Sequence, residues 1–118
     1  MKIDFANLLE SYNDKKNQID NAINDVINSS SFIMGEQVFE LERNLEKFTG
    51  SKFAISCSNG TDALLLAMMA LDIGPGDEVI TTPFTFISTA ETIAFLGAKP
   101  VFVDIDEQTF NIDENLIE

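Results

Sequence analysis

The residues with the clearest chemical potential lie in one short stretch, Ser58–Ala63, which follows a compact apolar run at Phe53–Cys57 and precedes a predicted helix. A strand that turns sharply into a helix leaves several backbone N–H groups unpaired, and the helix dipole favours an anion at that end. Gly60 lets the backbone come close to an anion, and Ser58 or Thr61 can add a hydroxyl donor. The stretch therefore predicts a phosphate site.

The same stretch also has a plainer interpretation, in which Asn59 and Gly60 form a tight turn and Thr61 only caps a helix. Because the charge of Asp62 would repel a phosphate, we expect its carboxylate to point away from the turn. Two other phosphate motifs are absent, since the turn at 74–76 lacks the third glycine of a dinucleotide loop and no Gly-Lys-Ser/Thr sequence occurs. A Rossmann dinucleotide site and a P-loop are therefore disfavoured.

A second candidate segment, Thr82–Ala90, lies at the carboxyl end of the next predicted strand. Ligands of open parallel sheets bind outside the carboxyl ends of strands, so this segment can share a crevice with the Ser58–Thr61 turn. In an extended segment Phe84 and Phe86 point to opposite sides, so one can stack on a heterocycle while the other packs inward. Taken alone, a phenylalanine at a strand end more often belongs to the core.

Several common chemistries lack the residues that they need. The chain has no His and one cysteine, Cys57, which we expect to be a buried small hydrophobe rather than a nucleophile. Asp104 and Asp106 alternate at a strand end, and two carboxylates without further ligands favour a strand-ending turn over a metal site. Catalysis therefore depends on Lys, Asp, Glu or a cofactor.

Charge and composition limit the partners. The 118 residues carry a formal charge of −13, which makes a polyanion such as nucleic acid a poor partner. No apolar run reaches the roughly 18 residues that span a bilayer, and Met1–Phe5 lacks the basic-then-apolar order of a signal peptide. We therefore expect a cytoplasmic protein that does not engage a membrane.

The spacing of apolar residues predicts the elements that position these segments. Two amphipathic helices fill the first half, and their apolar stripes are Ile19, Ile23, Val26 and Ile27, then Val38, Leu41, Leu45 and Phe48. Strands follow at 53–57, 79–82 and 100–105, with helices at 63–71 and from Ser88 or Thr89 to Leu96. Two helices followed by βαβαβ indicate an α/β fold, whose mainly parallel sheet is covered by helices on both faces.

We divide the chain into an N-terminal helical segment, residues 1–50, and the first part of an α/β domain, residues 51–118. We expect this domain to be incomplete, because its apolar strands need further helices and residues 113–118 look like the start of one. The loop Phe32–Gly35 is more apolar than a solvent-exposed loop should be. The rest of the fold or a partner chain is expected to cover it.

Five blocks of sequence occur together in a specific order and spacing: Gly35–Glu42, Ser58–Leu64, Gly74–Ile80, Pro83–Phe86 and Gly97–Asp106. In these blocks the chain resembles the N-terminal part of the nucleotide-sugar aminotransferases of the DegT/StrS type. These are pyridoxal-phosphate (PLP) enzymes of fold type I. Within the family it most resembles the enzymes that act on a UDP-linked 3-keto-N-acetylglucosaminuronic acid in O-antigen synthesis. The resemblance implies the first part of the PLP-binding large domain.

The resemblance also implies roles for single residues. The loop at Gly60 and Thr61 matches the one that holds the cofactor phosphate, Phe86 matches the aromatic residue that stacks on the pyridine ring, and Ser88 follows closely. The loop Phe32–Gly35 matches one near the subunit interface of homodimers that build the active site from both chains. The cofactor-binding residues expected in this way are Asn59, Gly60, Thr61, Phe86 and Ser88.

The family's Schiff-base lysine and the Asp that pairs with the pyridinium nitrogen have no counterpart here, since neither Lys52 nor Lys99 falls on the lysine motif. The resemblance therefore implies an inactive fragment of an enzyme that moves an amino group, from glutamate, to a keto sugar nucleotide. A 4-keto sugar substrate is the alternative within the family. A non-catalytic remnant and a flavodoxin-type phosphate-binding module are the alternatives outside it.

Overall fold

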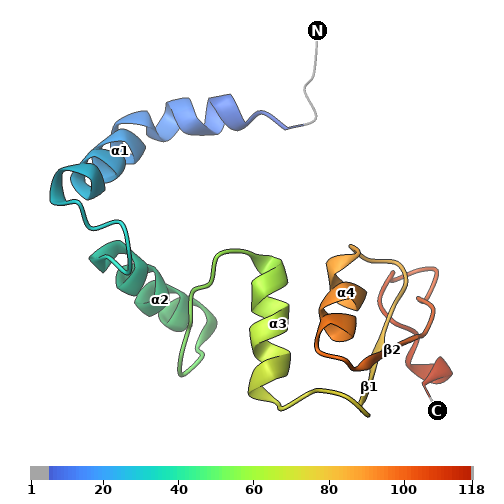
Figure 1. The fold of residues 1–118 in the computed structure, drawn as a ribbon. Helices are drawn as coiled ribbons and strands as arrows, with labels where there is room; N and C mark the ends of the chain where they lie inside the picture. Colours follow the sequence, from blue (N-terminus) through green and yellow to red (C-terminus); the bar gives the residue numbers. More distant parts are fainter. Residues whose placement is uncertain (1–5, 118) are drawn as a thin grey trace, which may run out of the picture. The chain divides into compact units, whose positions relative to one another are not determined.

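The structure is a computed structural model that describes residues 6–117, so the expectation for Met1–Phe5 lies outside the described residues. The elements in chain order are α1 (Leu8–Ser29), α2 (Glu36–Thr49), α3 (Gly60–Ala70), β1 (Glu78–Thr81), α4 (Ser88–Phe95), β2 (Lys99–Phe102) and the 3₁₀ helix η1 (Glu114–Leu116) (Figure 1). The chain divides into two compact units, one up to Ser56 and one from Cys57 onward. The expected domain boundary after residue 50 stays a prediction.

The first unit contains the two predicted amphipathic helices. The side chain of Asn7 caps α1 by accepting a hydrogen bond from the Glu10 N–H at 3.2 Å, and the helix ends at a left-handed residue, Ser30. Helix α2 ends at Gly50, whose φ of 72° places it in the left-handed region that glycine adopts without steric cost. The helices predicted from the apolar stripes are therefore confirmed.

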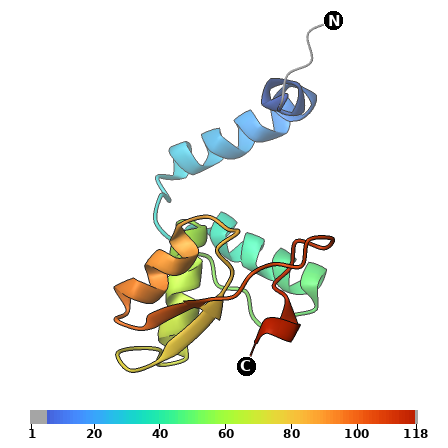
Figure 2. The same ribbon diagram turned by 90° about the vertical axis from the view of Figure 1, so that its right-hand side faces the viewer.

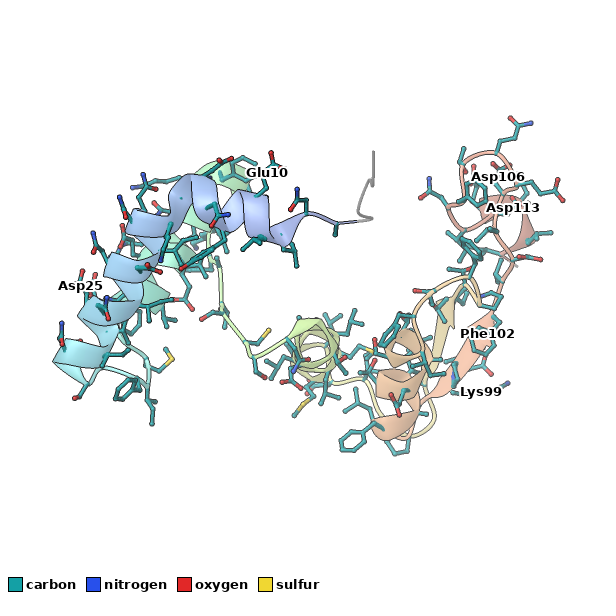
Figure 3. All side chains as sticks on the ribbon, turned by 90° about the horizontal axis from the view of Figure 1, so that it is seen from above. Glu10, Asp25, Lys99, Phe102, Asp106 and Asp113 are labelled. Carbon is teal, nitrogen blue, oxygen red and sulfur yellow. The ribbon has the colours of Figure 1, made fainter. Side chains whose placement is uncertain are left out.

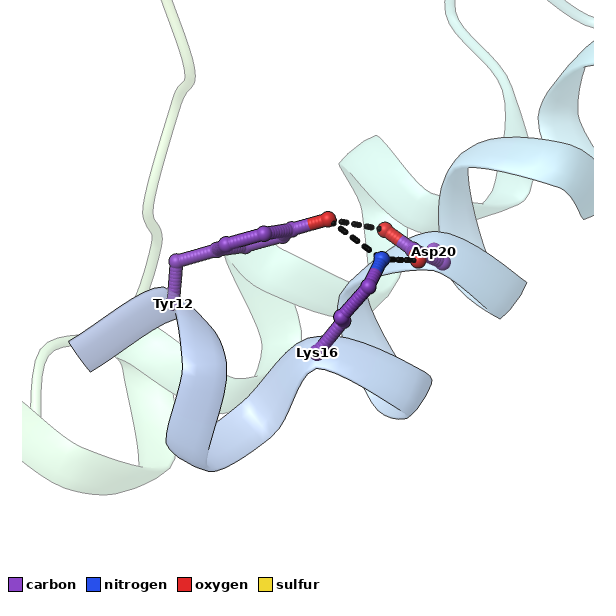
Figure 4. A network of polar contacts seen from close by, with 3 residues as sticks. All are labelled: Tyr12, Lys16 and Asp20. Atoms are coloured by element: carbon purple, nitrogen blue, oxygen red, sulfur yellow. Dashed lines mark hydrogen bonds and ion pairs between the residues drawn. The ribbon is translucent and has the colours of Figure 1, made fainter. Parts of the chain in front are cut away.

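A polar network stabilises the exposed surface of α1 (Figure 4). The Tyr12 hydroxyl donates to Asp20 at 2.8 Å, and the Lys16 ammonium donates to the Tyr12 oxygen at 2.8 Å and forms an ion pair with Asp20. The three residues are spaced four apart, so they lie along one helix face. The hydrogen bonds from Lys16 and Tyr12 lower the pKa of the Asp20 carboxyl. This network orders the helix rather than forming a reactive site.

In the second unit, helix α4 packs between α3 and a two-stranded parallel sheet of β1 and β2 (Figures 1 and 2). The strands pair from Glu78 with Lys99 to Thr81 with Phe102. The core forms around α4, and its buried residues are Ser88, Thr92, Ile93 and Ala98. This unit supplies the β-α-β part of the predicted α/β fold, and α4 is the element that joins its layers.

Three expectations about burial and pairing are wrong within the described residues. Residues 53–57 are extended but form no strand, because no neighbouring strand lies beside them. Helix α3 has no buried residue although it is apolar nearly all round. Cys57 is exposed rather than buried.

The ends of two elements also differ from the prediction. Helix α4 begins at Ser88 with Ile87 as its N-cap residue, so neither Ser88 nor Thr89 provides the predicted side-chain cap. Strand β2 ends at Phe102, and a loop with one antiparallel bridge between Ile105 and Ile112 follows. None of the helices within residues 6–117 combines the length and the apolar character needed to cross a membrane.

Candidate functional site

The predicted anion site lies at the N-terminus of α3. The Asn59 side chain accepts a hydrogen bond from the Asp62 N–H at 3.0 Å, and the Asn59 carbonyl accepts one from the Ala63 N–H at 3.1 Å. Among the described residues, the N–H groups of Gly60 and Thr61 have no acceptor. Such free donors at a helix N-terminus favour an anion.

The space around Gly60 also fits close approach by a ligand. Apart from its chain neighbours and the adjoining backbone of α3, a Cβ atom built on Gly60 would have no atom of the described chain within 4 Å, so the glycine faces open space. Because φ here lies outside the left-handed region, the backbone conformation does not itself require glycine. A group outside the chain that approaches the backbone is one reason for glycine at this position.

The expectation for Asp62 is wrong in this structure. Its carboxylate does not point away from the turn but accepts hydrogen bonds from the Ser58 hydroxyl and from the Asn59 amide at 3.1 Å. Both donors lie within one helical turn of Asp62, so they compete with water for its carboxylate oxygens. The Ser58 proton is thereby engaged, and the donors of the turn without an acceptor among the described residues are the N–H groups of Gly60 and Thr61 and the Thr61 hydroxyl.

Two hollows border helix α4 in this unit. Thr61 lines one of about 270 Å³, together with Asp62, Leu65, Glu91, Thr92 and Phe95. The two carboxylates in that lining, Asp62 and Glu91, disfavour an anion inside the hollow itself. Because the Asp62 carboxylate also bonds Ser58 and Asn59 of the turn, a phosphate at the N–H groups of Gly60 and Thr61 requires this carboxylate to leave those two partners.

Phe86 lines the second hollow, which is about 120 Å³ and lies at the carboxyl ends of β1 and β2 with Thr82, Pro83, Thr85, Ile87, Ala90 and Phe102. The Phe86 ring is 74% exposed, so its face is free to stack on a planar group. Within the described residues, no common hollow or hydrogen bond joins Phe86 to Thr61. The shared crevice remains a prediction.

Ser88 differs from the other predicted cofactor residues in its burial. It lies in the first turn of α4 and is 7% exposed, and its carbonyl accepts a hydrogen bond from the Thr92 hydroxyl at 2.8 Å. In this structure Ser88 contributes to the packing of α4. Its contact with a cofactor stays a prediction.

The loop after β2 has the turn predicted from Asp104 and Asp106. The Asp106 carboxylate accepts hydrogen bonds from the N–H groups of Thr109 at 2.8 Å and Gln108 at 3.1 Å, and these bonds lower the pKa of the Asp106 carboxyl. Figure 3 labels Asp106 and Asp113 in this part of the chain. No group of three potential metal-binding side chains occurs among the described residues.

An aromatic contact near the Phe86 hollow was not predicted. The rings of Phe84 and Phe110 lie 5.8 Å apart at an angle of 31°, and Phe110 has a φ of 59°, which is unusual for a bulky residue. Phe84 thus packs against Phe110, while Phe86 lines the hollow, as expected for alternate residues. The sequence has no local signal for a partner 26 positions away.

Comparisons with known proteins match this chain to one family of aminotransferases. The profile of the DegT/DnrJ/EryC1/StrS aminotransferase family matches residues 13–118. The chain is 52% identical, over 98% of its length, to a UDP-2-acetamido-2-deoxy-3-oxo-D-glucuronate aminotransferase from Pseudomonas aeruginosa, of which it covers 32%. The chain therefore spans about a third of the length of the curated relatives that it matches.

Solved structures agree with this sequence similarity. A DegT/DnrJ/EryC1/StrS aminotransferase from Brucella abortus superposes with a TM-score of 0.92 and 38% identity, covering 95% of this chain and 30% of its own. A sugar aminotransferase from Streptococcus pneumoniae, solved in its PLP form, has a TM-score of 0.72 and 35% identity, covering 80% of this chain and 25% of its own. The fold is therefore that of the N-terminal part of a PLP-dependent aminotransferase.

Proposed function

Because the chain belongs to the DegT/DnrJ/EryC1/StrS aminotransferase family, we propose that its parent protein transfers an amino group from glutamate to a keto sugar nucleotide in cell-surface polysaccharide synthesis. The substrate proposed is a 3-keto uronate, which the name of the P. aeruginosa relative supports. A homodimer in the cytoplasm is part of the same proposal. The exposed apolar side chains of Phe32, Ile33 and Met34 support a subunit interface at that loop.

The observation that carries the proposal is the N-terminus of α3, where the N–H groups of Gly60 and Thr61 have no acceptor among the described residues and the Cβ position of Gly60 is open. These groups suit the phosphate of PLP and need no cationic side chain, which fits a chain with a charge of −13. The exposed ring of Phe86 suits the face of the pyridine. When bound, PLP supplies the electron sink and carries the amino group between donor and acceptor.

The test compares PLP with pyridoxal, which lacks the phosphate. Gly60→Ala adds a methyl group that the fold accommodates but that blocks the anion's approach, and Gly74→Ala is the matched control because its Cβ would meet only Leu96 O at 3.9 Å. Losing a hydrogen bond to a charged group corresponds to roughly tenfold or more in affinity. We expect Gly60→Ala to weaken PLP binding by that factor and to leave pyridoxal binding unchanged. Equal PLP affinity of the two variants would contradict the proposal.

The substrate is tested with the full-length product of the gene. Its activity with 3-keto and 4-keto sugar nucleotides, with glutamate as donor, separates the proposed substrate class from the alternative. Higher kcat/KM with the 4-keto compound would reject the 3-keto proposal.

A non-catalytic role for these 118 residues is the second candidate. It is favoured by the lysines of region 51–118, because Lys99 pairs with Glu78 at 2.6 Å and Lys52 stacks on Phe53 at 5.1 Å, so both have local partners. Figure 3 labels Lys99 on β2. Borohydride reduction in the presence of PLP tests this role. Covalent labelling of one unique lysine in the chain would contradict it.

A further inference from the structure

The extended segment that leads to the Ser58–Thr61 turn is held by side chains of α2 instead of a neighbouring strand. Glu46 accepts a hydrogen bond from the Ala54 N–H at 3.2 Å, and Glu42 accepts hydrogen bonds from the N–H and the hydroxyl of Ser56, both at 2.8 Å. The chain leaves α2 at Gly50 and turns back beside it (Figure 1). All of these residues belong to the first unit.

The spacing of the two carboxylates matches the repeat of an extended chain. Residues four apart in an α-helix are separated by about 6 Å along the axis. Alternate residues of an extended segment, whose N–H groups point the same way, are separated by about 6.6 Å. Glu42 and Glu46 can therefore bind the N–H groups of Ser56 and Ala54 with the segment running antiparallel to the helix. A shift of one residue would turn both N–H groups away from the carboxylates.

Glu42 and Glu46 differ from Glu40 on the same helix in burial and in hydrogen bonding. The side chains of Glu42 and Glu46 are half-buried, whereas Glu40 on the same helix is exposed and has no hydrogen-bond partner among the described residues. The hydrogen bonds from Ser56 lower the pKa of the Glu42 carboxyl, so it is ionised at neutral pH. Hydrogen bonds to an ionised acceptor are the stronger kind.

We propose that Glu42 and Glu46 are positioning residues for the cofactor site, because they fix the register of the extended segment from which the Ser58–Thr61 turn follows in the chain. This inference rests on the proposed function of that turn. With one edge of the segment occupied by carboxylates, the N–H groups of Phe53 and Ile55, which have no acceptor among the described residues, mark the edge of this segment that is open to a β-strand.

The experiment measures amide hydrogen exchange and PLP affinity in the 118-residue chain and its variants. In Glu42→Ala, exchange at Ser56 and at the turn amides of Asp62 and Ala63 should increase at least about tenfold, and PLP affinity should fall by a similar factor. Glu42→Gln keeps an oxygen acceptor and should restore both to within about threefold of the wild type. The matched control, Glu40→Ala, should change neither.

Unchanged exchange at Ser56 in Glu42→Ala would overturn the inference. So would faster exchange at Ser56 with unchanged turn amides and PLP affinity, because the contact would then be structural only. If Glu42→Ala loses protection throughout α2, two other variants decide. Glu42→Gln should stay within about threefold of the wild type, and Ser56→Ala should weaken PLP binding without unfolding α2. Failure of the wild type to prefer PLP over pyridoxal would reject the proposed function, while exchange at Asp62 and Ala63 would still test the positioning role.

Discussion

Replacing Ile93 by alanine should unfold the second unit more effectively than any other single aliphatic truncation. Ile93 is 2% exposed and lies on α4, the helix that packs against α3, β1 and β2. The substitution removes three carbons, worth about 0.8 kcal/mol each, and the cavity that remains raises the loss to about 3 kcal/mol. At 0.05–0.15 kcal/mol per residue, residues 57–118 have a stability of roughly 3–9 kcal/mol. The variant should therefore lose a third or more of it.

Urea unfolding followed by far-UV circular dichroism measures this loss, because the chain has no Trp and one Tyr as fluorescent reporters. Ile93→Val should cost about 1 kcal/mol, and Ile87→Ala, at a side chain that is 67% exposed, less than about 0.5 kcal/mol. The order of the three variants follows from the burial of the side chain and from the number of carbons removed. A loss below about 1 kcal/mol in Ile93→Ala would refute the assignment of α4 as the centre of the core.

Three further predictions follow from single contacts. Gly97→Ala should destabilise the second unit by about 1–2 kcal/mol in urea, because φ is +80° there and its Cβ would lie 3.1 Å from Pro75 Cγ; an unchanged midpoint would contradict this. Asn59→Ala should lower the free energy of unfolding by about 1 kcal/mol, because it removes the acceptor of the Asp62 N–H. Asn59→Asp should preserve this stability but weaken PLP binding, because its negative charge repels the phosphate. Equal stability of the two variants would reject the capping role. The contribution of Glu42, whose pKa is lowered in the folded chain, should be complete above the ordinary glutamate pKa and be lost as the pH falls below about 4. Wild-type and Glu42→Gln chains should therefore differ less in amide exchange at pH 3 than at pH 6, and a constant difference would argue against this linkage.

Local features of the fold were predictable because they depend on residues within one helical turn. The apolar stripe from Val38 to Phe48 and the glycine at position 50 were sufficient for α2 and its end. The turn at Asp106 follows likewise from a short side chain that bonds nearby N–H groups. The helix cap expected at Thr61 is instead provided by Asn59, whose side chain accepts a hydrogen bond from the Asp62 N–H. These interactions need no information from the rest of the chain.

Burial and pairing were not predictable in the same way, because they depend on residues distant in sequence. Cys57 looked like a core residue from its apolar neighbours, but no element of the described chain covers it. The segment 53–57 had the composition of a strand, yet its partners are the carboxylates of Glu42 and Glu46. Strand composition indicates an extended backbone and does not specify what binds its N–H groups.

The sequence by itself determined the order of helices α1 to α4 and of strands β1 and β2, the helix-terminus turn at Asn59–Thr61 and the family. The tertiary structure decided that Asp62 folds over that turn, that Phe84 packs on Phe110 while Phe86 lines a hollow, and that α4 lies between α3 and the sheet. The division has a physical reason. Backbone conformation and capping are short-range properties, whereas the direction of a carboxylate and the exposure of a ring depend on which distant groups the folded chain brings near.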